Sequence, residues 1–139
     1  MIKETHTIMV VDDHQLFLEG MVRILEDEAD FRIIGSFNNG MNLLRALYGI
    51  CPDIVVLDVQ LQMMNGIELA AEIKRRYPQI KILFVSMFDS AAIIKQGRAA
   101  GVEGFIPKTS DALLVKQTIR EILQGREVFI RPEFQPSED

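Results

Sequence analysis

Several residue types that would decide the class of a protein are scarce in this sequence. Among 139 residues there is one cysteine, Cys51, and no tryptophan. A single cysteine excludes an internal disulfide, and with only two histidines beside it the chain has no pattern for a zinc site. There is also no apolar run of about 18 residues and no signal-peptide pattern, so we expect a soluble chain in the reducing cytoplasm, without membrane contact.

Positive charge is scarce as well. Fifteen Lys and Arg residues stand against 20 Asp and Glu residues, the net charge is −5, and the longest basic run is Lys74-Arg75-Arg76. We therefore do not expect these residues to bind nucleic acid themselves. What the chain does contain is typical of a globular protein, with 48% hydrophobic residues in the length of one domain, which leaves no room for a separate substrate domain.

Short apolar runs alternate with longer amphipathic segments. Residues 8–11, 54–57 and 82–85 are continuously apolar and rich in β-branched side chains, as parallel strands covered on both faces are. Residues 31–37 and 104–106 predict two further strands. The intervening segments carry apolar residues at helical spacing, among them Leu18, Met21, Val22 and Leu25, then Leu69, Ala70, Ile73 and Tyr77, then Val115, Ile119, Ile122 and Leu123.

The boundary signals agree with this division. Helix starts are predicted at Asn65-Gly66, Asp89-Ser90 and Ser110-Asp111, and a helix end at Tyr77-Pro78. Five repeats of strand then helix predict a doubly wound α/β domain, with helices on both faces of a parallel sheet. Ligands of such folds bind beyond the carboxyl ends of the strands, where the strand order reverses.

Charged and hydroxyl side chains follow these strand ends. Asp12 and Asp13 follow the first strand, Asp58 the third, Ser86 the fourth and Lys108 the fifth. Carboxylates that meet at one edge repel one another by ~4 kcal/mol per close pair at an effective dielectric constant of about 20, so a divalent cation is expected between them. Oxygen ligands favour Mg²⁺. A carboxylate surrounded by Mg²⁺, a hydroxyl and an ammonium is a site for an aspartyl phosphate.

At these positions the sequence resembles the receiver domain of bacterial two-component response regulators. The resemblance covers residues 7–130. Residues 12–20 and 86–90 are similar in particular to the NarL/FixJ (LuxR-type) branch, whose members usually carry a helix-turn-helix output domain. The motifs that carry the resemblance are, in order, Val10-Val11-Asp12-Asp13-His14, Val56-Leu57-Asp58 with Asn65-Gly66, Val85-Ser86-Met87, and Gly104-Phe105-Ile106-Pro107-Lys108.

The resemblance implies a flavodoxin-like fold with five parallel strands in the order 2-1-3-4-5. It also implies that Asp58 is the phosphoacceptor. Asp13 is then a direct Mg²⁺ ligand, and Asp12 a ligand that acts mainly through water. Asp58 and the backbone carbonyl of Gln60 complete the ligands that the protein supplies.

The resemblance further implies how the domain switches and with what it works. Ser86 and Lys108 contact the phosphoryl group, and phosphorylation draws Ser86 toward Asp58 while Phe105 moves into the space that Ser86 leaves. The implied partners are a sensor histidine kinase, a C-terminal helix-turn-helix output domain and a second copy bound through the first and fifth helices. Such a receiver phosphorylates and dephosphorylates itself and is not a conventional enzyme.

The sequence departs from the family pattern in two places. Gln62 stands where a proline usually follows the phosphoacceptor by four residues, so the loop there is expected to be less rigid. Thr109 follows Lys108, where a proline is usual, and the proline of this chain precedes the lysine as Pro107.

Other interpretations of the same residues remain. Asp12-Asp13-His14 also fits a polar turn that caps the first helix, and Phe105 also fits the core. A haloacid-dehalogenase-like phosphatase would need an acid where Gln60 stands, and a flavodoxin-like cofactor binder would need a phosphate-binding loop after the first strand. A receiver-only phosphorelay protein and a pseudo-receiver that serves only as a docking module are further alternatives.

The end of the chain differs from the rest. Residues 131–139 contain two prolines and close on an acidic stretch, which predicts the start of an interdomain linker or a disordered tail after a receiver domain at 1–130. The length is then that of a receiver cut from a longer regulator, with a naturally separate receiver as the alternative.

Overall fold

The computed structural model describes residues 4–88 and 91–131. Strands and helices alternate along the chain, as the sequence predicts. In chain order they are β1 (His6–Val11), α1 (Gln15–Glu26), β2 (Phe31–Phe37), α2 (Gly40–Leu47), β3 (Ile54–Asp58), β4 (Gln60–Leu61), β5 (Met64–Asn65), α3 (Gly66–Arg76), β6 (Lys81–Ser86), α4 (Ala91–Ala100), β7 (Gly104–Pro107), α5 (Ala112–Leu123) and β8 (Val128–Phe129).

Six strands form one parallel sheet in the order β2-β1-β3-β6-β7-β8. The first five of these are the strands that the sequence predicts, in the predicted order. The predicted number of five is wrong, because β8 follows α5 and pairs with β7, Val128 opposite Gly104 and Phe129 opposite Phe105. A strand of two residues is too short to show a period of two in the sequence, and only its pairing defines it.

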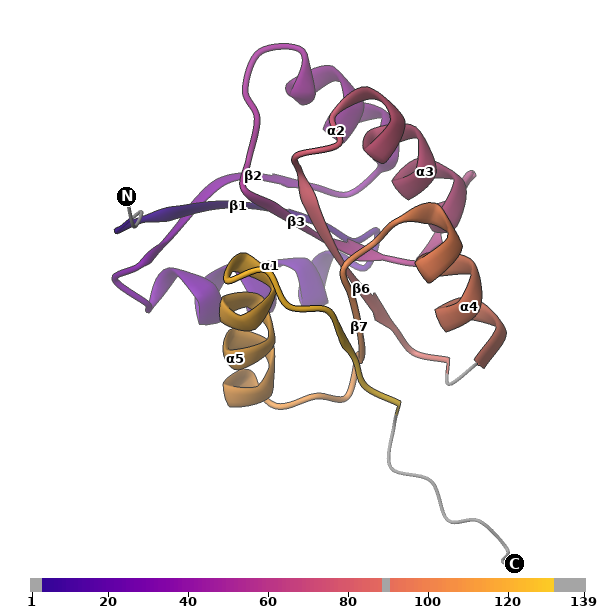
Figure 1. Ribbon diagram of the computed structural model, residues 1–139. Helices are drawn as coiled ribbons and strands as arrows, with labels where there is room; N and C mark the ends of the chain where they lie inside the picture. The colour runs from indigo at the N-terminus through magenta and orange to yellow at the C-terminus, as the bar shows by residue number, and fades with distance from the viewer. Residues whose placement is uncertain (1–3, 89–90, 132–139) are drawn as a thin grey trace, which may run out of the picture.

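Helices cover both faces of the sheet (Figure 1). One face packs against α1 and α5 through residues such as Leu25 and Ile119. The other packs against α2, α3 and α4, with Leu43 and Ile73 at its core. All five residues of β3 are buried, because this central strand has neighbours on both edges and helices on both faces.

The helix ends follow the predicted boundary signals. The Asn65 side chain accepts a hydrogen bond from the backbone N–H of Ile67 at the start of α3, and Asp111 accepts one from Leu114 at the start of α5, both at 2.8 Å. These caps satisfy N–H groups that a helix leaves unpaired in its first turn. The signal predicted at residues 89–90 lies outside the described residues.

A small antiparallel hairpin joins β3 to α3. It consists of β4 and β5, which the sequence pattern does not predict. Met63 in its turn has a φ of 64°, in the left-handed region that residues other than glycine seldom adopt. The hairpin begins two residues after Asp58 and so lies beside the site described below.

The expectations about membrane contact and about the C-terminal linker concern the described residues to different extents. Within the described parts of the chain, no helix has both the length and the apolar character that crossing a membrane requires. The linker expected at residues 131–139 lies outside the described residues, apart from Arg131.

Candidate functional site

The parallel strands bring the predicted polar side chains to one edge of the sheet. The strand order reverses between β1 and β3, because β2 lies on one side of β1 and β3 on the other. Asp12 and Asp13 follow β1 at this point, and Asp58 ends β3. Ser86 ends the neighbouring strand β6, and Lys108 follows β7. The carboxyl ends of strands at such a reversal are where open α/β sheets bind ligands.

Two buried carboxylates share one ammonium at the centre of this edge. Asp12 and Asp58 are only 2% and 4% exposed. The Nζ of Lys108 lies 2.9 Å from Oδ2 of Asp12 and 3.2 Å from Oδ2 of Asp58. Asp13 is partly exposed and offers a third carboxylate, so that one oxygen from each of the three acids lies within 4.8 Å of the others. The cluster therefore carries more negative charge than Lys108 can neutralise.

Burial and the surplus of negative charge both shift the pKa values of the groups at this edge. The pKa of Asp58 is raised, mainly because burial disfavours the charged carboxylate and secondly because Asp12 repels it; the Gln60 N–H and Lys108 act against this. The pKa of Lys108 is also raised. Burial is the largest single influence and acts to lower this pKa, but the attraction of Asp12 and Asp58 together outweighs burial. A further positive charge at this edge would favour the ionised form of Asp58.

Backbone N–H groups orient each of the three carboxylates. Asp12 Oδ1 accepts from His14 N at 2.8 Å, and Asp58 Oδ1 from Gln60 N at 3.0 Å. The bond from His14 N to Asp12 closes a polar turn before α1, as the alternative interpretation of Asp12-Asp13-His14 expects. The His14 side chain itself makes no capping hydrogen bond to α1.

The carboxylate of Asp13 is held by a hydrogen bond from a residue 49 positions away. Its Oδ2 accepts a hydrogen bond of 2.7 Å from the backbone N–H of Gln62, in the turn of the β4–β5 hairpin. A proline at position 62 would have no N–H to donate. The departure from the family pattern that the sequence shows at Gln62 thus gives Asp13 a hydrogen-bond donor.

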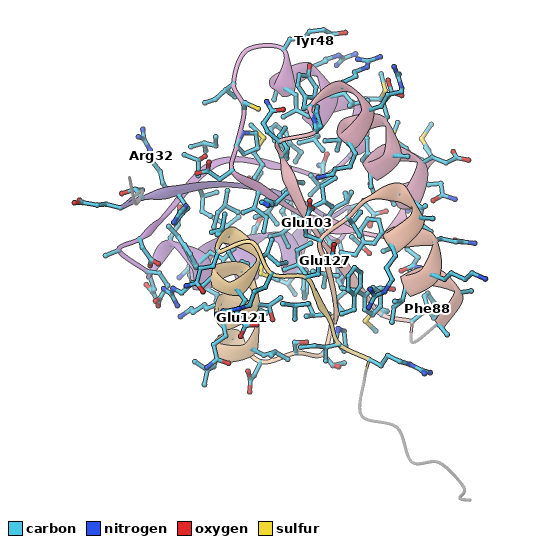
Figure 2. All side chains as sticks on the ribbon, in the orientation of Figure 1. Arg32, Tyr48, Phe88, Glu103, Glu121 and Glu127 are labelled. Carbon is cyan, nitrogen blue, oxygen red and sulfur yellow. The ribbon has the colours of Figure 1, made fainter. Side chains whose placement is uncertain are left out.

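Ser86 contacts Gln60, a partner that sequence reasoning missed. The Ser86 hydroxyl is 1% exposed; it donates to Oε1 of Gln60 at 3.0 Å and accepts from the Phe88 N–H at 3.1 Å. Figure 2 shows Phe88 beside the start of α4. The sequence places Gln60 beside the phosphorylation pocket, but no local signal predicts a side-chain contact between residues 26 apart.

Phe105 lies in the core. Its side chain is fully buried in β7, which agrees with the interpretation that it packs, and its backbone carbonyl accepts a hydrogen bond from Ile130 N at 2.8 Å. The predicted switch residue is therefore joined to the segment that follows β8.

The comparisons with known proteins agree with this site. Residues 8–120 match the response regulator receiver domain family. The chain belongs to this family. The receiver is 30% identical over 118 residues to the transcriptional regulatory protein DegU of Brevibacillus brevis, an alignment that covers 85% of this chain and 50% of DegU.

Two solved structures are similar in both sequence and fold. The signal receiver domain of NarL from Mycobacterium tuberculosis is 31% identical, with a TM-score of 0.82 over 88% of this chain and 99% of that one. A LuxR-family two-component response regulator from Aurantimonas sp. SI85-9A1 is 31% identical, with a TM-score of 0.86 over 92% and 91% of the two chains. The receiver is thus of the NarL/FixJ (LuxR-type) branch, as its sequence predicts. It spans half to three fifths of the length of the curated relatives it matches.

The acidic edge of the receiver suits Mg²⁺. Its donors are carboxylate oxygens from Asp12, Asp13 and Asp58, with no sulfur or imidazole among them. Mg²⁺ prefers such hard oxygen ligands and commonly keeps several waters, which fits a cluster that is open on the side of the partly exposed Asp13.

Proposed function

We propose that this receiver accepts a phosphoryl group on Asp58 and changes its surface in response. The observation that carries the proposal is the position of the Asp58 carboxylate, which is buried at the carboxyl edge of the sheet and shares the Lys108 ammonium with Asp12. A carboxylate oxygen is a nucleophile, and Lys108 is close enough to bind a phosphoryl oxygen once that group is attached. Because the pKa of Asp58 is raised, an added cation would favour its ionised, nucleophilic form.

Asp12, Asp13, Asp58 and the backbone carbonyl of Gln60 would hold Mg²⁺ in this proposal. The ion, when bound, neutralises carboxylate charge and orients a phosphoryl group. The hydrogen bond from Gln60 N to Asp58 supports the proposed ligand set, since it keeps the Gln60 backbone beside the acidic cluster.

Ser86 and Phe105 form the proposed switch. Before phosphorylation Ser86 is bonded to Gln60, so this bond breaks when the hydroxyl turns to the phosphoryl group. Phe105 then occupies the vacated space and changes the face formed by α4, β7 and α5. Because β8 pairs with β7 at Phe105, the change also reaches the chain after Phe129.

The proposed partners follow from the family and from the length of the relatives. A sensor histidine kinase supplies the phosphoryl group, and the receiver at residues 1–130 is followed, through a linker that begins at residue 131, by a DNA-binding output domain. DegU is a transcriptional regulatory protein about twice as long as the matched segment, which supports this organisation. A second copy binds through α1 and α5, where Leu16 and Leu113 are 76% and 62% exposed.

Labelling with acetyl phosphate and Mg²⁺ tests the phosphoacceptor. We expect one alkali-labile, hydroxylamine-sensitive phosphoryl group per chain in the wild type and none in Asp58→Asn. Asp111→Asn is the matched control, because it makes the same chemical change at the exposed start of α5 and asparagine is an equally good cap. Labelling that persists in Asp58→Asn, or an unlabelled wild type, would refute the assignment.

A further inference from the structure

The ammonium of Lys108 has a third neighbour besides its two carboxylates. Nζ lies 4.5 Å from the centroid of the Phe17 ring, which projects from the first turn of α1. A cation over an aromatic face is attracted to the ring's negative quadrupole, more strongly when water is excluded. The Lys108 side chain is only 7% exposed, so this contact is largely desolvated.

A cavity next to this contact offers Lys108 another position. It lies between α1 and α5, has a volume of about 240 Å³ and is lined by Phe17, Lys108, Gly20, Met21 and Val115 among others. A long, flexible lysine side chain at the wall of such a space can turn into it whenever its partners weaken. The contacts of the ammonium therefore decide whether Lys108 stays at the acidic edge or turns into the cavity.

Binding of a divalent cation weakens two of the three contacts. Asp12 and Asp58 are both the ion-pair partners of Lys108 and members of the acidic cluster that would bind Mg²⁺. A cation bound to their oxygens competes with the ammonium for the same charge and repels it. The Phe17 ring is neutral and no metal ligand, so its attraction for Lys108 remains.

We infer that Phe17 is a positioning residue, which keeps the Lys108 ammonium at the phosphorylation site when a divalent cation occupies the carboxylates. The inference rests on the proposed function, since it concerns the moment at which Lys108 must meet a phosphoryl oxygen. Phe17 touches no reacting atom; it acts through Lys108. Leucine at position 17 would fill similar apolar space without an aromatic face, whereas tyrosine would keep that face.

Phenylalanine, leucine and tyrosine at position 17 can be compared in the labelling reaction with acetyl phosphate at saturating Mg²⁺. We expect Phe17→Leu to be labelled about fivefold more slowly than the wild type, and Phe17→Tyr at nearly the wild-type rate. The Mg²⁺ dissociation constant, measured by calorimetry, is expected to stay within about twofold in both variants, because Phe17 supplies no ligand. Ile24→Val is the control for packing, since it removes one methylene-sized group from the lining of the same cavity and leaves the Phe17 ring in place.

A second measurement does not depend on phosphorylation or on any variant. The ring current of Phe17 is expected to shift the NMR signals of the Lys108 side-chain end upfield, both before and after Mg²⁺ is added. A shift that disappears on Mg²⁺ binding overturns the inference, as does wild-type labelling of Phe17→Leu or slow labelling of Phe17→Tyr. An unlabelled wild type with a persistent shift refutes the proposed function instead and leaves the Phe17 contact intact.

Discussion

Asp58, the proposed phosphoacceptor, is a buried carboxylate that lowers the stability of the folded chain. It is buried beside Asp12, and its raised pKa means that the folded protein binds its proton more tightly than the unfolded chain does. Stability is therefore lost as the pH rises from the ordinary pKa of 3.8 through the raised folded value, and the loss is complete above that value. Above that value and without a divalent cation, ionised Asp58 therefore lowers the stability of the fold that carries it.

We predict that Asp58→Asn raises the free energy of unfolding at neutral pH, on the order of 1 kcal/mol, when divalent cations are chelated. The gain shrinks as the pH falls toward 3.8, because the wild-type carboxyl is then neutral as well. Urea denaturation at several pH values measures the difference. Asp111→Asn should show no such pH-dependent gain, and a destabilised Asp58→Asn at neutral pH would contradict the prediction.

Gln62 supports Asp13 through its backbone alone. Asp13 is partly exposed, and the 2.7 Å hydrogen bond from Gln62 N orients its carboxylate toward the cluster. We predict that Gln62→Pro, which removes the N–H, weakens Mg²⁺ binding about fivefold, because the partners of metal ligands tune affinity. Gln62→Ala keeps the N–H and should bind Mg²⁺ like the wild type in calorimetry. Equal affinities for the proline and alanine variants would show that the bond has no influence.

At the scale of elements, the backbone is closely packed where β3 leads into α3. Gly66 begins α3 against the backbone that follows Asp58. A Cβ at position 66 would lie 2.5 Å from the carbonyl oxygen of Val59 and 2.8 Å from that of Asp58. Backbone atoms cannot turn aside as a flexible side chain can, so α3 or the loop after Asp58 would have to move.

We predict that Gly66→Ala destabilises the fold by about 3 kcal/mol and also slows the labelling of Asp58. Gly20→Ala is the matched control. Gly20 lies within α1, no atom lies within 4 Å of the position its Cβ would take, and alanine favours helix, so this variant is expected to gain about 0.5–1 kcal/mol. Thermal and urea denaturation of the two variants measure both effects, and equal stability of the two would contradict the packing argument.

For the whole molecule, the exposed apolar residues on α1 and α5 predict self-association. We expect a phosphoryl mimic such as beryllofluoride with Mg²⁺ to increase the sedimentation coefficient of the receiver, and Leu113→Glu to abolish the increase by placing a charge in the contact. Met41→Glu is the control, because Met41 is 51% exposed on α2, away from the proposed contact. The same sedimentation with and without the mimic, or loss of the increase in Met41→Glu alone, would contradict it.

Much of the architecture could be predicted because local patterns encode it. Central strands such as β3 are buried on both faces and must be continuously apolar, and caps such as Asn65 and Asp111 mark helix starts by their chemistry. β8 and the β4–β5 hairpin could not be predicted, since elements of two residues carry no periodicity.

The sequence by itself determined the alternation of strands and helices and the acidic character of the site, because these depend on periodicity and on the types of residues at strand ends. Its resemblance to receiver domains implied the family and the order of the first five strands. Only the tertiary structure decided which side chains of the site contact one another. It placed the Lys108 ammonium between Asp12 and Asp58 and over the ring of Phe17, and it joined Ser86 to Gln60. These contacts join residues far apart in the chain, and their geometry arises only when the helices pack on the sheet.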